Sequence, residues 1–82
     1  LDLSNNELVE TPAAMCNLTE LRILNLKSNR LTIIHPSILN LTKIYHLDLE
    51  NNRITYIPRE ISQLVNLTYF RTVGNPISYF PK

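Results

Sequence analysis

The side chains that could take part in catalysis or bind a metal ion are few in this chain, which has two histidines and one cysteine. His46, Asp48 and Glu50 alternate with leucines, so they would point the same way along a β-strand. Successive members would then lie about 6.6 Å apart, which is too far for all three to converge on one ion. Zinc sites also usually add cysteine or a second histidine. We therefore predict that the chain binds neither a metal ion nor a cofactor.

A nucleophile with its base is no better supported. A thiolate needs a base within hydrogen-bond reach, but Cys16 and His35 fall on segments that run away from the strand that carries His46. The lone Cys16 is best interpreted as a small apolar side chain of the core, and one cysteine cannot form an internal disulfide. The single glycine of the chain excludes a glycine-rich phosphate loop. We predict that the chain is not an enzyme in itself.

The elements that position these residues recur at a fixed interval. Leu1, Leu24, Leu47 and Phe70 are evenly spaced along the chain, and most other apolar residues keep the same step. Such a period is typical of a solenoid, in which each unit buries its apolar face against its neighbours. We expect one domain over 1–82 with about 3.5 repeats, namely two complete units (21–43 and 44–66) between two partial ones (1–20 and 67–82).

The pattern within a unit resembles a known family. Leu21-x-x-Leu24-x-Leu26-x-x-Asn29-x-Leu31 is similar to the signature of the leucine-rich repeat, and the match extends along the whole chain. The resemblance implies an α/β fold: a right-handed horseshoe-shaped solenoid with a concave parallel β-sheet and short α or 3₁₀ segments on the convex side. The stretch Ile57-Pro58-x-x-Ile61-x-x-Leu64 resembles the intracellular type found in Ras-suppressor-like proteins. We therefore expect an intracellular, cytoplasmic protein.

The alternating stretch of each unit also predicts which side chains face the concave side. Leucines such as Leu24 and Leu26 point inward, and their neighbours point out. The outward residues form columns of mixed character that include tyrosine and arginine, which are enriched at binding hot spots. We predict that the partner-binding residues are Ile23, Asn25, Lys27, His46, Asp48, Glu50, Tyr69 and Arg71.

A recurring asparagine follows each predicted strand, at Asn6, Asn29, Asn52 and Asn75. An amide offers both donors and acceptors, so this ladder should satisfy backbone groups that turn away from the sheet. The return segments carry Pro12, Pro36 and Pro58, and proline suits the first turn of a helix.

The last unit departs from the template. Thr72 replaces an inward apolar residue, and Gly74-Asn75-Pro76 follows, where Pro76 lacks a backbone donor. This triplet resembles the final unit of many leucine-rich arrays. We expect a piece of a longer array that ends or changes character soon after Phe80-Pro81.

Charge and composition exclude several partners. The net charge is +1, with 8 basic and 7 acidic residues interspersed, so we predict no binding of nucleic acid. No apolar run approaches the roughly 18 residues of a membrane-spanning helix. Asn17, Asn40 and Asn66 each begin an Asn-Leu-Thr glycosylation sequon. The repeat template dictates the leucine in each, so the sequons weakly favour an extracellular protein.

Three classes of function remain open. We favour a non-catalytic scaffold for protein–protein interaction that binds its partner through the concave sheet. The alternatives are a targeting or regulatory arm of a larger enzyme, of the deadenylase, adenylate cyclase or kinase type, and a fragment of an extracellular receptor ectodomain. The partner's identity and the oligomeric state do not follow from the sequence.

Overall fold

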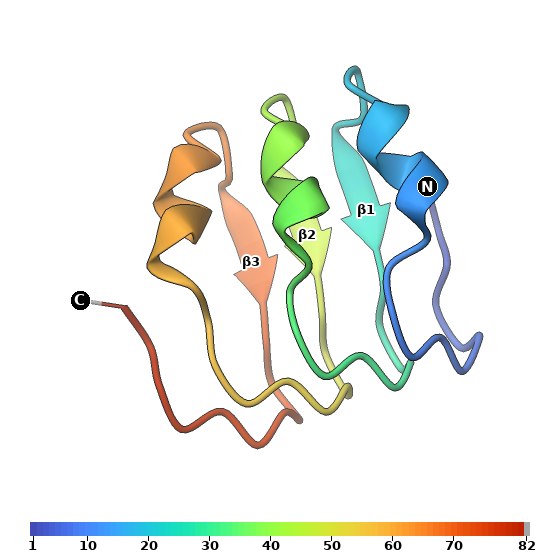
Figure 1. Ribbon diagram of the computed structural model, residues 1–82, viewed down its shortest axis with the longest axis vertical. Coiled ribbons are helices and arrows are strands. Elements are labelled where there is room, and N and C mark those ends of the chain that lie inside the picture. The colour runs from blue at the N-terminus through green and yellow to red at the C-terminus, as the bar shows by residue number, and fades with distance from the viewer. Residues whose placement is uncertain (82) are drawn as a thin grey trace.

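The computed structural model describes residues 1–81, with the exception of the side chain of Cys16. A short 3₁₀ helix and a short strand alternate along the chain (Figure 1). Their order is η1 (Ala13–Asn17), β1 (Ile23–Asn25), η2 (Pro36–Asn40), β2 (His46–Asp48), η3 (Arg59–Gln63) and β3 (Tyr69–Arg71). The role predicted for Cys16 as a core side chain lies outside the described residues.

The three strands form one parallel sheet in the order β1-β2-β3. Leu24 pairs with Leu47, and Leu47 pairs with Phe70, so the register follows the period of the sequence. An isolated bridge between Asp2 and Asn25 continues the ladder toward the N-terminus. The sheet predicted from the alternating leucines is thus confirmed.

The helical segments all adopt the 3₁₀ form, which is one of the two forms expected. Residues three apart lie on one face of a 3₁₀ helix. Ile38 and Ile61 in the helices, and Leu41 and Leu64 directly after them, pack in the core. Proline marks where the segments begin. Pro36 is the first residue of η2, whereas Pro12 and Pro58 lie just before η1 and η3.

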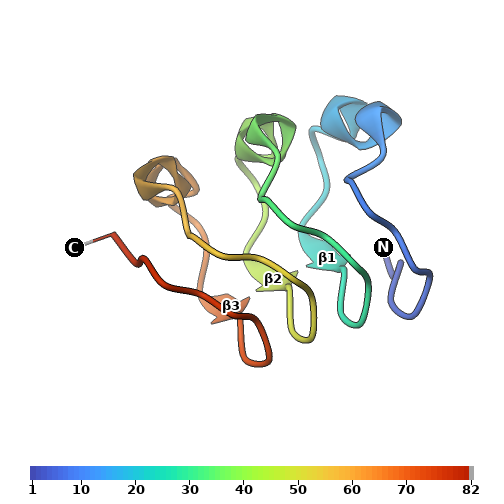
Figure 2. The same cartoon turned by 60° about the horizontal axis from the view of Figure 1, so that its bottom comes forward.

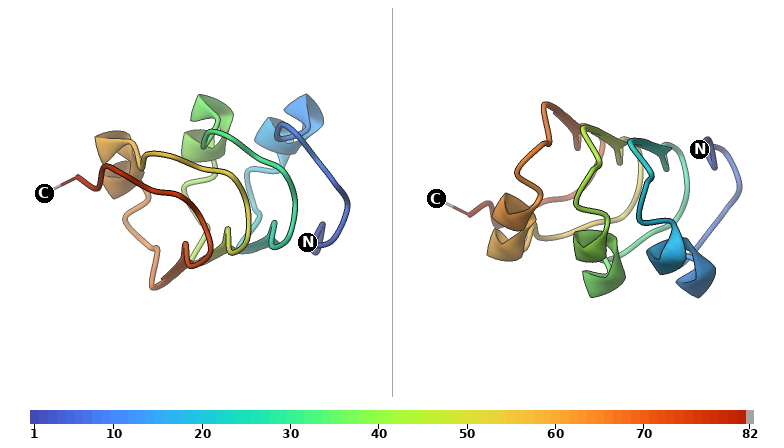
Figure 3. Two further views of the ribbon diagram at one scale, coloured as in Figure 1. Left: turned by 90° about the horizontal axis from the view of Figure 1, so that it is seen from below. Right: turned by 90° about the horizontal axis from the view of Figure 1, so that it is seen from above.

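The core lies between the sheet and the 3₁₀ helices and is best buried in the two complete units. Figure 3 shows the strands along one side of the molecule and the helices along the opposite side. Leu24, Leu47 and Ile44 have no exposed surface, whereas Leu1 is 48% exposed and Phe80 is 56% exposed. Burial therefore depends on having a neighbouring unit on both sides, as a solenoid requires.

The units stack side by side in a shallow arc (Figure 2). The fold is that of a leucine-rich-repeat solenoid with an open sheet, as the sequence predicts. Among the residues that the structure describes, no helix is long and apolar enough to cross a membrane.

Candidate functional site

The strand register brings two outward ring side chains together on the concave sheet. His46 of β2 pairs with Tyr69 of β3. Their rings stack with centroids 3.9 Å apart and planes inclined by 15°. Ile23 precedes them in the same column and is 42% exposed. The three side chains follow one another in one column and form an apolar and aromatic strip across the sheet.

Arg71 lies beside Tyr69 at the β3 end of this strip. Its guanidinium carbon lies 5.2 Å from the centre of the Tyr69 ring, and its Nε donates a hydrogen bond of 2.9 Å to the Tyr69 hydroxyl. Glu50 Oε1 lies 3.9 Å from the same nitrogen. The hydrogen bond to Tyr69 and the nearby Glu50 and Asp48 raise the pKa of Arg71 above its ordinary value. We call Ile23, His46, Glu50, Tyr69 and Arg71 the concave cluster.

The next outward column serves the backbone. Asp48 Oδ1 accepts a 3.0 Å hydrogen bond from the Glu50 N–H, and Asn25 Oδ1 accepts one of 3.0 Å from the Lys27 N–H. Such side-chain bonds to a backbone N–H two residues ahead are typical of Asp and Asn where a turn begins. Asp48 is only 7% exposed. Asn25 and Asp48, both predicted to bind a partner, thus help to end their strands.

Asp2 occupies the same column in the first unit. Its Oδ1 accepts hydrogen bonds from the hydroxyl and the N–H of Ser4, at 2.6 and 2.9 Å. These two bonds lower the pKa of the Asp2 carboxyl below its ordinary value. Lys27 follows Asn25 by two residues, lies beyond the end of β1 and is exposed.

The asparagine ladder connects each unit to the one before it. Asn29 Oδ1 accepts hydrogen bonds from the backbone N–H groups of Asn6 and Leu8, both at 3.0 Å. Asn29 Nδ2 donates to the carbonyls of Leu3 and Leu26, also at 3.0 Å. One buried amide therefore satisfies backbone groups in two units at once.

The later members of the ladder repeat this geometry. Asn52 accepts from the Leu31 N–H at 3.1 Å and donates to the Leu26 carbonyl at 3.0 Å. Asn75 accepts from the Ile54 N–H at 3.0 Å. Asn6, in the first unit, is exposed, and its side-chain Nδ2 donates to the Leu3 carbonyl within its own unit.

A second recurring position precedes the ladder and was missed in the sequence. Asn5, Ser28, Asn51 and Gly74 hold the same place in successive units, and all have φ between 57° and 84°. This left-handed conformation favours glycine and, to a lesser degree, asparagine. The recurrence of Asn, Ser or Gly at these four places is the sequence signal that could have predicted the turn. Gly74 thus belongs to a turn that every unit makes.

The histidines and sequons show no convergence on a reactive centre. Among the side chains that the structure describes, no three His, Cys, Asp or Glu residues gather as metal ligands would. His35 is occupied at the start of η2, where its Nδ1 accepts from the Ser37 N–H at 3.1 Å. The sequon asparagines are all exposed, and Asn66 Nδ2 donates to the Thr42 carbonyl at 3.1 Å.

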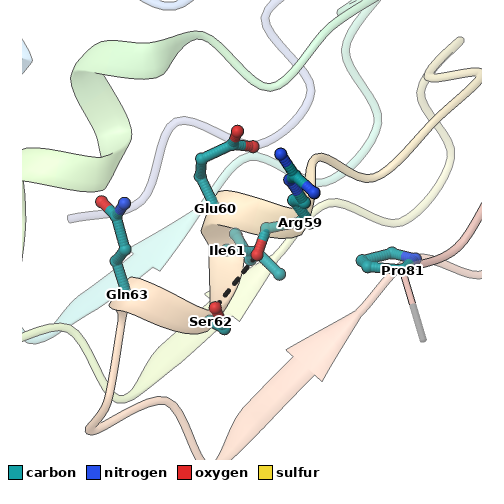
Figure 4. A pocket seen from close by; sticks show the side chains of 6 residues that line it. All are labelled: Arg59, Glu60, Ile61, Ser62, Gln63 and Pro81. Carbon is teal, nitrogen blue, oxygen red and sulfur yellow. Dashed lines mark hydrogen bonds between the residues drawn. The ribbon is translucent and has the colours of Figure 1, made fainter.

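An open hollow lies on the convex side, at the C-terminal end of the stack. It is lined by residues 59–63 of η3 and by Pro81 (Figure 4). The Ser62 hydroxyl donates to the Arg59 carbonyl at 3.0 Å, which turns it toward its own helix. The side chains around the hollow form no reactive pair.

Comparison with known proteins agrees with this geometry. A family model of the leucine rich repeat matches residues 19–77, so the chain belongs to the leucine-rich repeat family. A search of curated proteins finds no match. Among solved structures, the chain is similar to an LRR protein of Leptospira interrogans, with a TM-score of 0.92 and 32% sequence identity.

That alignment covers 99% of this chain and 21% of the Leptospira chain. The chain therefore spans about a fifth of that protein. Leucine-rich repeat proteins generally act as scaffolds for protein–protein interaction and are typically non-catalytic.

Proposed function

We propose that this chain is a protein-binding scaffold that engages a protein partner with the concave cluster. The observation that carries this proposal is the packed arrangement of His46, Tyr69 and Arg71 on the parallel sheet. Tyrosine and arginine are over-represented among the residues that dominate binding energy. Side chains held in place before binding lose less entropy when a partner arrives.

The chemistry of the concave cluster indicates the kind of surface it fits. Ile23 and the His46–Tyr69 stack offer an apolar strip, and Arg71 and Glu50 flank it with opposite charges. A partner with an exposed aliphatic or aromatic side chain between polar groups would match this surface. Asn25 and Asp48 support it through the turns that end their strands.

The double variant Tyr69→Ala/Arg71→Ala tests the proposal. We expect that it captures far less partner in a pull-down from a lysate than the unmodified chain, because the loss of a hot-spot residue typically costs about 2 kcal/mol or more in binding. Circular dichroism should show the same folded spectrum, since both side chains lie on the outer side of the sheet.

The matched control lies on the opposite side of the molecule. Arg59 and Gln63 are exposed residues of η3, and the 3₁₀ helices lie on the side of the molecule opposite the strands (Figure 3). The variant Arg59→Ala/Gln63→Ala should retain the partner. Equal capture by the concave variant, or loss of capture only in the convex variant, would move the site away from the concave cluster.

We propose an intracellular location, because the repeat resembles the intracellular type. The alternative of a receptor ectodomain would use the three exposed sequon asparagines. Treatment of the native protein with an N-glycosidase should leave its mass unchanged. A loss of mass would favour the extracellular alternative.

A further inference from the structure

A second hollow lies between the two complete units of the chain. It has a volume of about 340 Å³, which is near the lower end of the range for ligand pockets. The helices η2 and η3, which lie side by side in the stack (Figure 1), contribute to its walls. We call it the inter-unit hollow, and six residues line it: Ile34, Pro36, Leu39, Tyr56, Pro58 and Glu60.

One wall of the inter-unit hollow depends on where the proline of the second unit lies. The first and third units have a proline just before the helix, whereas the second unit has His35 there and its proline one residue later. Pro36 is therefore the first residue of η2. Pro36 and Leu39 are three residues apart and so share one face of this 3₁₀ helix. Together with the buried Ile34, they make an apolar wall.

The facing wall carries an exposed aromatic ring. Tyr56 is 43% exposed, although it has a neighbour in its column on each side, Ile33 and Tyr79. Ile33 is also 43% exposed, so the apolar surface extends beyond the hollow. Contiguous exposed apolar surface marks interaction sites. Among the described residues, the Tyr56 hydroxyl meets no hydrogen-bond partner, so it can donate to an occupant.

The backbone beside the hollow favours an occupant that needs no strand pairing. The Ile57 N–H already donates to the Tyr79 carbonyl at 3.0 Å, and the two lining prolines have no N–H to give. A polyproline II segment makes no internal hydrogen bonds, so its carbonyls are free to accept. Such segments dock in grooves that are lined by aromatic side chains.

The charge of the lining indicates a basic residue in the occupant. Of the six lining residues, only Glu60 is charged. It is exposed, and it forms no salt bridge with any other described residue. Complementary charges favour the correct partner and its orientation. A lysine or arginine beside the docked residues would therefore match this surface.

We propose that the inter-unit hollow binds an extended, proline-rich segment of a partner protein that carries a lysine or arginine. A proline or aliphatic side chain of the segment enters between η2 and Tyr56, the Tyr56 hydroxyl donates to a carbonyl of the segment, and the cation faces Glu60. The site shares no residue with the concave cluster. The chain can therefore hold such a segment independently of a partner on the sheet.

Fluorescence anisotropy with a labelled synthetic peptide tests the proposal on the 82-residue chain. The probe is a short Pro-x-x-Pro peptide with one lysine, made in two versions with the lysine before or after the prolines. One version should bind saturably, with a dissociation constant between about 1 μM and 1 mM. The same peptide with alanine for each proline should bind at least about tenfold more weakly, because it loses more conformational entropy on binding. Equal binding of the alanine peptide, or no saturable binding up to about 1 mM, would overturn the proposal.

Tyr56→Ala tests the aromatic wall. We expect at least about tenfold weaker binding of the lysine peptide, the scale for loss of a hot-spot tyrosine. The matched control is Tyr45→Ala, since Tyr45 is 41% exposed but lies just before β2 and does not line the hollow. Circular dichroism should show both variants folded. No loss in Tyr56→Ala, or an equal loss in the control, would contradict the proposal.

A charge exchange at Glu60 tests the orientation of the peptide. Glu60→Lys should weaken the lysine peptide by about twofold to fivefold at low salt and strengthen, by a similar factor, a peptide with glutamate in place of lysine. Unchanged binding of both peptides would remove Glu60 from the site. Amide NMR spectra of the unmodified chain give the location: the peptide should shift the signals of residues 34–39 and 56–60. Shifts confined to the strands of the sheet would overturn the proposal.

Discussion

Thr11 places a polar hydroxyl inside the apolar core. It takes the place that Ile34 and Ile57 hold in the following units, and it is 7% exposed. Its hydroxyl is buried and meets no hydrogen-bond partner among the side chains and backbone groups that the structure describes. A buried hydroxyl that lacks a partner costs about 1–3 kcal/mol. Thr11 therefore lowers the stability of the first unit.

Replacement of Thr11 by valine should raise the free energy of unfolding by about 1–2 kcal/mol, because valine keeps the shape and removes the hydroxyl. Urea unfolding followed by circular dichroism measures the change. Thr55→Val is the matched control, since Thr55 is exposed and should shift stability by no more than about 0.5 kcal/mol. A destabilised Thr11→Val protein would show that the hydroxyl has a partner in solution.

At the scale of the element, the turn after each strand combines two demands. One residue must adopt the left-handed conformation, and the next places its amide between units. The left-handed position is held by Asn5, Ser28, Asn51 and Gly74. Of these residue types, only glycine adopts the conformation without steric cost. The asparagine ladder supplies the amides that lie between units.

Ser28→Gly should stabilise the protein by about 0.5–1 kcal/mol. Relief of the left-handed cost of about 1–2 kcal/mol is partly offset by the entropy that glycine loses on folding. Thermal unfolding measures the gain. The reverse change, Gly74→Ala, should destabilise, because φ is 84° there and a Cβ would lie 2.1 Å from Asn51 Oδ1. If Ser28→Gly lowers the melting temperature, the serine makes a contribution that outweighs its backbone strain.

Asn52→Ala should lower the free energy of unfolding by about 1–3 kcal/mol, since it leaves buried backbone groups of two units unpaired. Differential scanning calorimetry reports the shift in melting temperature. Asn6→Ala is the control within the same ladder, because Asn6 is exposed and its loss should cost clearly less. Equal effects at the two positions would argue against a role that depends on burial.

At the scale of the whole molecule, stability is concentrated in the middle of the stack. Each unit contacts only its neighbours, so a solenoid gains most where a unit is covered on both sides. Leu47 is fully buried between the first and third strands, whereas Leu1 in the same column is 48% exposed.

Leu47→Ala should cost about 2–5 kcal/mol, the range for a large residue removed from a packed core. Leu1→Ala, the same substitution at the end of the column, should cost less than about 1 kcal/mol. Urea unfolding of the two variants gives the comparison directly. Similar costs would mean that the end unit is as well packed in solution as the middle one.

The sequence by itself determined the architecture, because leucines that recur with one constant period can bury their apolar face in few other ways. It also determined the strand register and the positions of the ladder, since each follows from the same step. The partner-binding role of the outward columns remains a prediction, and so do the domain limits and the intracellular location.

Only the tertiary structure decided what the outward side chains contact. The period places His46 beside Tyr69, but their stacking depends on side-chain rotations that no spacing reveals. The burial of Asp48 and its bond to the Glu50 N–H likewise depend on how tightly the strand turns. The reason is physical: a repeat fixes the backbone through many equivalent contacts, whereas a single surface side chain is placed by the few neighbours it meets in space.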